Sequence, residues 1–281
     1  MTYATLVLQL DDHPAIDERI DQAARLARSF ESHVVGLAAA DHTLFGLGVA
    51  TGFSGRSDLA HAVQESRASC RARATHFRQR LETATRVPSF EAVVDDEDEV
   101  GALVRHGSCC DLLVLGQPAP TGNQVARDRD RLEQVVLQSA APTLVLPSSA
   151  RTGLTLASAM IAWDGSHGAA RAVAGALPLL RRAGRVHLVR FDTAADIGRG
   201  VGSHDFDLPR DWLGRHGVRV DAQLARAGRE VGGALLAHAR ELGADLVVLG
   251  AWGVPRWAER LLGGTTRTVL GEMDVAVLTA H

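Results

Sequence analysis

Asp111-Leu-Leu-Val-Leu-Gly116 occurs again, almost unchanged, as Asp245-Leu-Val-Val-Leu-Gly250, later in the same chain of 281 residues. Each stretch is a short, continuous apolar run that ends in glycine, which is typical of a buried strand in a parallel sheet. A second pair of matching segments, Leu8-Gln-Leu-Asp11 and Ile161-Ala-Trp-Asp164, precedes them in the same order. A recurrence of this kind indicates two tandem copies of one structural unit.

The repeats divide the chain into two expected domains, residues 1–148 and 153–281, with the turn-rich segment Pro147–Gly153 between them. The first copy is longer, and Thr43–Ser57, rich in glycine and serine, is interpreted there as a loop. In each copy short apolar runs alternate with segments of helical periodicity, such as Glu97–His106 and Arg131–Ser139. This alternation predicts an α/β fold with two doubly wound parallel sheets, whose ligands bind beyond the carboxyl ends of the strands.

The composition excludes several functions. Every basic residue is an arginine, so neither a Schiff-base lysine nor the lysine of a classical P-loop is available. The net charge of −3 provides no general attraction for nucleic acid. Three cysteines, an odd number, favour a reducing compartment over a disulfide framework. The first residues resemble no signal peptide, and no apolar run is long enough to span a bilayer, so we expect a cytoplasmic protein away from membranes.

The fourth strand of the second copy is followed by a glycine pattern, Gly-x2-Gly-x9-Gly-Gly, formed by Gly250, Gly253, Gly263 and Gly264. Glycine lets the backbone approach a phosphate closely and adopt positive φ. The N–H groups at the start of the following helix have no partner within the helix and favour an anion, and the hydroxyls of Thr265 and Thr266 add donors. The alternative is a glycine-rich turn in which Thr265 serves only as a helix N-cap.

This loop, together with the stretch from Leu246 to His281, resembles the ATP-binding loop of the universal stress protein family, including tandem bacterial members. The resemblance implies two five-stranded parallel sheets and an adenine nucleotide, ATP or a relative, bound by the second copy; whether Mg²⁺ accompanies it stays open. Transferred position by position, the family's site falls on Ala162, Asp164, Arg190, Leu249, Gly250, Gly253, Gly263, Gly264 and Thr265, with Thr266 as an additional hydroxyl donor.

Two positions depart from the family pattern. Gly264 stands where the family usually has serine or threonine, so Thr265 or Thr266 has to supply the hydroxyl. Arg190 is large and charged where a small apolar residue is usual, and it would either stack on the adenine or block it. Asp164 also has a purely structural interpretation as part of a helix N-cap, a role that Ser166 could fill instead.

The first copy lacks the glycine pattern. Gln117-Pro118-Ala-Pro120-Thr-Gly122 follows its fourth strand, and the two prolines remove N–H donors where a phosphate would need them. Asp11 is retained, but alone it binds nothing. We therefore expect the first copy to be a partner domain without nucleotide.

Other candidate sites are weaker. His106, Cys109 and Cys110 have the residue types of metal ligands but no suitable spacing, so no metal site is predicted. The acidic run Asp95–Glu99, after an expected strand Phe90–Val94, resembles a cation site but begins a helix, where carboxylates are favoured by the dipole. Arg256, Arg260 and Arg267 flank the glycine loop, and one of them could reach phosphates; otherwise they are surface charges.

The leading hypothesis is a nucleotide-binding regulatory module of a stress response that acts on an unknown protein partner, and not an enzyme, because no general base is evident. The alternatives are a slow ATPase or nucleotide hydrolase on the same fold, and a scaffolding member without ligand. Leu144-Val-Leu146 matches Ala276-Val-Leu278 in the last strands, and single-domain relatives commonly dimerise through that strand. We expect the two last strands to pack together as a pseudo-dimer within one chain; a homodimer of the chain stays open.

Overall fold

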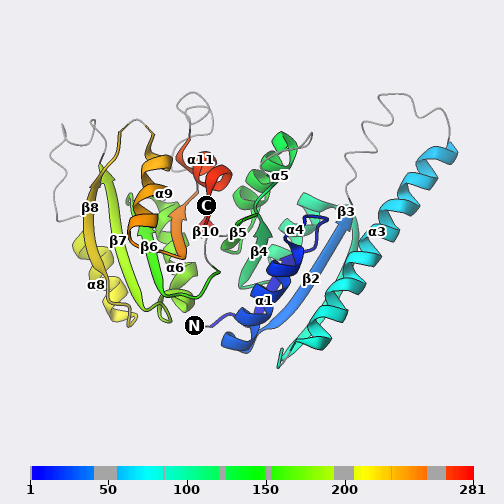
Figure 1. The fold of residues 1–281 in the computed structure, drawn as a ribbon, viewed down its shortest axis with the longest axis horizontal. Coiled ribbons are helices and arrows are strands. Elements are labelled where there is room, and N and C mark those ends of the chain that lie inside the picture. The colour runs from blue at the N-terminus through cyan, green and yellow to red at the C-terminus, as the bar shows by residue number, and fades with distance from the viewer. Residues whose placement is uncertain are drawn as a thin grey trace. The chain divides into compact units, whose positions relative to one another are not determined.

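The computed structural model describes residues 2–40, 56–84, 86–119, 125–149, 153–192, 206–228, 230–251 and 264–281 (Figure 1). It divides into two compact units. The N-terminal unit comprises Tyr3–Gly116 and Ser139–Ala141, and the C-terminal unit comprises Met1–Thr2, Gln117–Gln138 and Pro142–His281. The last helix and the last strand of the first copy therefore belong to the same compact unit as the second copy.

The N-terminal unit is a parallel sheet in the order β3-β2-β1-β4. Its apolar strands are buried because helices cover both faces: α1 and α3 lie together on one face and α4 on the other (Figure 1). The elements are β1 (Thr5–Gln9), α1 (Ile16–Phe30), β2 (His33–Ala40), α3 (Arg56–Thr83), β3 (Ser89–Asp98), α4 (Glu99–Gly107) and β4 (Leu112–Gly116).

The C-terminal unit contains the second copy as a parallel sheet in the order β10-β9-β6-β7-β8. Helices α9 and α11 lie on one face and α6 and α8 on the other (Figure 1). Its elements are α5 (Val125–Gln138), β5 (Thr143–Leu146), β6 (Ser158–Ala162), α6 (His167–Leu180), β7 (Arg185–Asp192), α8 (Asp207–Arg215), β8 (Asp221–Arg226), α9 (Val231–Glu241), β9 (Leu246–Gly250), α11 (Thr265–Glu272) and β10 (Ala276–Ala280). The predicted doubly wound α/β architecture is confirmed.

The last strands of the two copies, β5 and β10, pair antiparallel within the C-terminal unit. Val145 lies opposite Val277, its own counterpart in the repeat, and both side chains are fully buried. A pairing in which equivalent residues face each other is the pattern of a two-fold symmetric contact. The expectation that the two last strands pack side by side is thus confirmed.

Two further contacts join segments of the first copy to α11 in this unit. The buried Gln117 donates a hydrogen bond from Nε2 to the Leu270 carbonyl at 3.1 Å, and its side-chain oxygen accepts from the Ser148 N–H at 3.0 Å. Arg267 of α11 forms a two-pronged ion pair with Glu133 of α5, at 2.8 and 3.1 Å. Gln117, directly after β4, therefore has a structural role in this unit.

The aspartate that opens each repeated strand motif anchors the start of its copy. Asp111 accepts hydrogen bonds from the N–H groups of Ala4 and Thr5 at 2.8 and 2.9 Å. Asp245 accepts from the N–H groups of Thr155 and Ala157 at 2.8 and 3.1 Å, and from the Thr155 hydroxyl at 2.6 Å. Each carboxylate satisfies backbone donors where the first strand of its copy begins, so the motif is retained for the fold.

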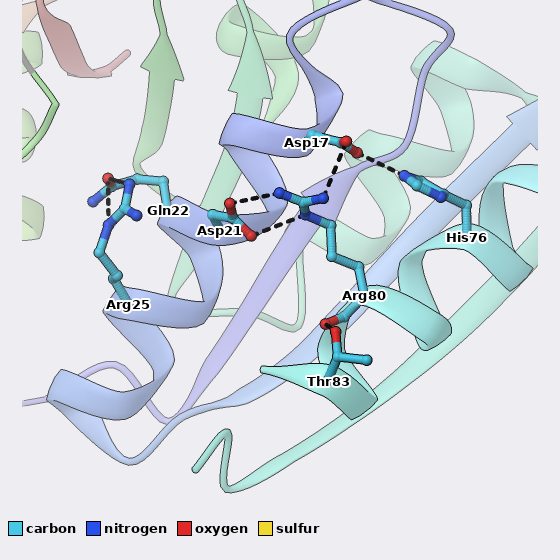
Figure 2. Close-up of polar contacts among 7 residues, drawn as sticks. All are labelled: Asp17, Asp21, Gln22, Arg25, His76, Arg80 and Thr83. Atoms are coloured by element: carbon cyan, nitrogen blue, oxygen red, sulfur yellow. Dashed lines mark hydrogen bonds and ion pairs between the residues drawn. The ribbon is translucent and has the colours of Figure 1, made fainter. Parts of the chain in front are cut away.

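A polar network joins α3 to α1 on the N-terminal unit (Figure 2). Arg80 of α3 donates to Asp21 at 2.9 and 2.7 Å and to Asp17 at 3.1 Å, and His76 contacts Asp17 at 2.6 Å. Beneath this network the Phe77 ring lies where a side chain on Gly36 of β2 would be, 2.7 Å from the position of its Cβ. Helix α3 is thus held closely against both the sheet and α1.

Three predicted boundaries were wrong. Strand β3 does not end before the acidic run but continues to Asp98, with Asp95 paired to Ala39 of β2. Helix α4 consequently begins at Glu99 and not at Glu97, and the Asp98 side chain caps it by accepting from the N–H groups of Val100 and Gly101. Helix α5 begins at residue 125, six residues before the predicted start. The loop predicted at 43–57 lies outside the described residues except for its last two, which belong to α3.

Candidate functional site

The carboxyl ends of β6 and β9 are neighbours, because Ala162 is paired with Leu249 in the sheet. Asp164 follows β6 by two residues and is exposed. Its carboxylate accepts the Ser166 N–H at 2.9 Å, while the Ser166 hydroxyl caps α6 by accepting the Ala169 N–H at 3.1 Å. Ser166 therefore performs the capping, and within the described residues no cation is paired with Asp164. Its remaining acceptor capacity faces solvent.

Gly250 ends β9 directly beneath the first turn of α6. A Cβ at this position would lie 2.3 Å from the Ala169 nitrogen and 2.7 Å from the Gly168 carbonyl carbon. Gly168 is equally constrained, since its own Cβ would lie 3.1 Å from the Ala251 oxygen and 3.2 Å from the Ala280 oxygen. The packing of helix on sheet is thus sufficient reason for glycine at 250, whatever else approaches the strand end.

The second half of the glycine loop leads into α11. Gly264 is the N-cap residue of α11, with no side-chain hydrogen bond capping the helix. Thr265 is partly exposed, whereas the Thr266 side chain is 2% exposed, so Thr265 has the accessible hydroxyl. The first turn of α11 packs closely on α9, because a Cβ on Gly232 would lie 3.0 Å from the backbone carbonyl oxygen of Thr265. Gly253, Gly263, Arg256 and Arg260 lie outside the described residues.

Arg190 lies near the carboxyl end of β7, opposite Leu224 of β8. Its Nε donates to Asp192 Oδ1 at 3.2 Å, and the side chains are 16% and 8% exposed. The guanidinium is thereby held by a largely buried carboxylate two residues further along the same strand.

The comparisons with known proteins relate the second copy to a protein family. Residues 158–281 match the model of the universal stress protein family. The second copy is thus similar in sequence to the universal stress protein family. A search of curated protein sequences returns no match.

The fold of the whole chain is similar to that of solved universal stress proteins. One from Archaeoglobus fulgidus DSM 4304 has a TM-score of 0.76 at 15% identity, over 98% of this chain and 95% of that chain. A functionally unknown protein from Pseudomonas aeruginosa PAO1 has a TM-score of 0.57 at 15% identity, over 98% and 92%. A universal stress protein in complex with cAMP has a TM-score of 0.38 at 17% identity over 53% of this chain and 100% of its own, too low to support an argument about ligands here.

The first copy has a different arrangement at the corresponding position. Asp11, the counterpart of Asp164, forms an ion pair with Arg19 of α1, whose side chain is 2% exposed. Arg19 Nη1 donates to Asp11 Oδ2 at 2.9 Å, and Nη2 binds the other carboxylate oxygen. The two equivalent aspartates therefore differ: Asp11 is paired with an internal arginine, and Asp164 has no cation partner among the described residues. Sequence reasoning missed Arg19, although an arginine between Ile16 and Ile20 on an apolar helix stripe was a visible signal.

Two of the weaker candidates, the acidic run and Cys110, have contacts or burial that the structure describes. Asp95 is engaged by the Arg105 guanidinium and lies 3.3 Å from His106 Nε2. Burial would raise the pKa of Asp95, but the hydrogen bond from the Glu97 N–H, with Arg105 and His106 nearby, lowers it overall. Burial raises the pKa of the Cys110 thiol to about 12, which keeps it unreactive at neutral pH. No group of three or more potential metal ligands occurs among the residues that the structure describes.

None of the helices in the described segments combines the length and the apolar character needed to cross a membrane.

Proposed function

We propose that the second copy binds ATP or a related adenine nucleotide beyond the carboxyl ends of β6 and β9, and that the chain acts as a regulatory module whose partner contacts depend on the nucleotide. The observation that carries the proposal is the contrast between the two aspartates. Among the described residues, the exposed Asp164 accepts only a backbone N–H of its own turn, whereas the equivalent Asp11 is neutralised by a buried arginine.

The residues around Asp164 fit a nucleotide. A carboxylate accepts hydrogen bonds from ribose hydroxyls, and Asp164 has the capacity to do so. The N-terminus of α11, where Gly264 is the N-cap residue and Thr265 has a partly exposed side chain, offers N–H and O–H donors to phosphates, aided by the helix dipole. Arg190 adds a positive charge on β7. Gly253 and Gly263 would complete the phosphate loop, as the family resemblance implies.

Titration calorimetry of the full chain with ATP tests the proposal, using two matched substitutions. We expect one site per chain. Asp164→Asn keeps the oxygen that accepts the Ser166 N–H but loses the negative charge, so its Kd should rise about tenfold, equivalent to about 1.4 kcal/mol for a charge-assisted hydrogen bond. Asp11→Asn, at the equivalent position of the first copy, should leave the Kd unchanged. Two equivalent sites, no binding at millimolar ATP, or equal loss in both variants would refute the proposal.

A further inference from the structure

The crevice of the first copy is the place beyond the carboxyl ends of the parallel strands β1 and β4, where the strand order reverses and a doubly wound sheet ordinarily binds its ligand. Arg19 projects into this crevice from α1. A Cβ on Gly116, the last residue of β4, would lie 2.2 Å from Arg19 Nη1 and 2.5 Å from Cζ. The guanidinium thus rests directly on the glycine backbone and binds Asp11 with both of its terminal nitrogens.

A second arginine covers the neighbouring strand ends. Arg73 of α3 donates from Nη1 to the Leu10 carbonyl, just beyond β1, at 2.9 Å, and from Nη2 to the Ala39 carbonyl of β2 at 3.5 Å. Its Nε lies 3.6 Å from Asp12 Oδ1. These contacts occupy the β1 and β2 edge, beside the place filled by Arg19. The α1–α3 network of Arg80, Asp17 and Asp21 holds the two helices that carry the arginines together (Figure 2).

Several other polar groups at these strand ends are hydrogen-bonded, whereas Nε of Arg19 and Nε of Arg73 are buried without a hydrogen-bond partner in the described residues. The Gly116 N–H donates to Gln9 Oε1 at 3.2 Å, and Gln9 Nε2 donates to Glu99 at 2.8 Å. His13 Nδ1 accepts the Ala15 N–H at 3.0 Å. Burial and the positive charge of Arg19 lower the pKa of His13, against the opposing charges of Asp11 and Glu18.

The second copy offers the matched comparison. Arg19 lies eight positions after Asp11, and the residue eight positions after Asp164 is Ala172, which is buried. An alanine cannot reach the strand ends, and Gly250 there contacts the backbone of α6 instead of a side chain. In the part of the chain that the structure describes, the internal cation is therefore found in the first copy and not in the second.

We propose that the first copy contains a guanidinium-binding site, formed by the Asp11 carboxylate over the bare backbone of Gly116, which the chain fills with its own Arg19. Asp11 and Gly116 bind the group as they would a small ligand: the carboxylate takes the two terminal nitrogens, a geometry that suits the planar fork of a guanidinium, and the glycine lets it approach face-on. Removal of the Arg19 side chain then leaves a site for a free guanidinium compound. The proposal does not depend on nucleotide binding by the second copy.

Chemical rescue of Arg19→Ala in the full chain tests this. Loss of one partner of a buried ion pair should lower the Tm. Methylguanidinium at millimolar concentration, far below denaturing levels, should then raise the Tm of the variant by about 3–5 °C, the shift expected when ligand stands at about ten times its Kd. The wild type should not respond, and neither should Arg25→Ala, which removes an arginine of α1 paired within its own helix to Gln22. Methylammonium, a cation without the planar fork, should not rescue.

A second variant keeps the outcome interpretable. Arg19→Met fills the crevice without a charge, so methylguanidinium should leave its Tm unchanged, while the pKa of His13 measured by NMR should rise above that of the wild type. Absence of rescue in Arg19→Ala, whether this variant is folded or unfolded, would overturn the proposal. Equal rescue of the wild type, or of Arg19→Met, would show a non-specific effect and would overturn it as well.

Discussion

Gly250 belongs to the glycine pattern that the sequence associates with phosphate binding, yet its surroundings are the backbone of α6. The nearest atoms to an added Cβ would be the Ala169 nitrogen and the Gly168 carbonyl carbon, both in rigid helix. A glycine in such a loop can therefore be required by helix packing alone. Loss of nucleotide binding after its substitution would not by itself show contact with phosphate.

The substitution Gly250→Ala should destabilise the protein by about 1–3 kcal/mol, because the added methyl group overlaps backbone atoms that cannot move without displacing α6. Thermal unfolding measures the effect. Gly214→Ala is the matched control, since nothing lies within 4 Å of a Cβ there and α8 should gain about 0.5–1 kcal/mol from the better helix former. A Gly250→Ala variant as stable as the control would contradict the packing explanation.

At single residues, sequence reasoning was strongest where backbone chemistry is local. Ser166 as the cap of α6 and Asp164 beside it follow from the residue types after a strand, and the structure places both as that reasoning allows. The position of Arg19 on an apolar stripe marked it as an unusual cation, but its pairing with Asp11 could not be predicted, because that contact depends on how α1 packs over β4. The ends of the glycine loop at Gly250 and Gly264 were located by pattern, but the reason for Gly250 needed the position of α6.

Among the elements, strands were easier to predict than helix starts. The repeated strands β4 and β9 are apolar, continuous and buried, and both begin and end within a residue of the prediction. The predicted boundary between β3 and α4 was wrong because the acidic run suits two local structures, the first turn of a helix and an exposed edge strand. Pairing of Asp95 with Ala39 of β2 decides in favour of the strand, and such a cross-strand contact is not encoded locally.

The pairing of β5 with β10 places two threonines face to face. Thr143 lies opposite Thr279, both are buried, and neither hydroxyl has a hydrogen-bond partner in the described residues. Replacement of both by valine keeps the shape and removes the unsatisfied groups. The double variant should be more stable by about 1 kcal/mol or more, since a buried unsatisfied hydroxyl costs about 1–3 kcal/mol.

Urea unfolding of Thr143→Val, Thr279→Val and the double variant forms a complete cycle. Independent gains are expected from the two single substitutions. If each single variant loses stability and the double variant recovers it, the hydroxyls are bonded to each other and this interpretation of the strand pair is wrong.

For the whole molecule, the two tandem copies were predictable from the repeat, but the division into compact units was not. The segment Gln117–Gln138 and strand β5 belong by sequence to the first copy and by contacts to the C-terminal unit. Two long-range contacts link this segment to the C-terminal unit: Gln117 bonds to Leu270, and Glu133 pairs with Arg267. No local sequence pattern around Gln117 or Glu133 predicts such a partner.

A fragment of residues 153–281 should therefore dimerise or aggregate, because it leaves the apolar edge of β10 without β5. Light scattering measures the outcome. A fragment of residues 117–281, which keeps α5 and β5, is the control and should associate less, since its exposed edge is the four-residue strand β5. A shorter fragment that stays monomeric at high concentration would show that β10 does not need its partner strand.

The pairing of Val145 with Val277 also bears on how such a chain can diverge. In a homodimer one gene specifies both subunits, so any substitution that fills a crevice fills it twice. Once the two-fold contact is made inside a single polypeptide, each half accumulates its own substitutions while the shared strand pair stays intact. An arginine at position 19 then alters one half alone. The two-fold symmetry is kept in the strand pair, while the crevices of the two halves differ.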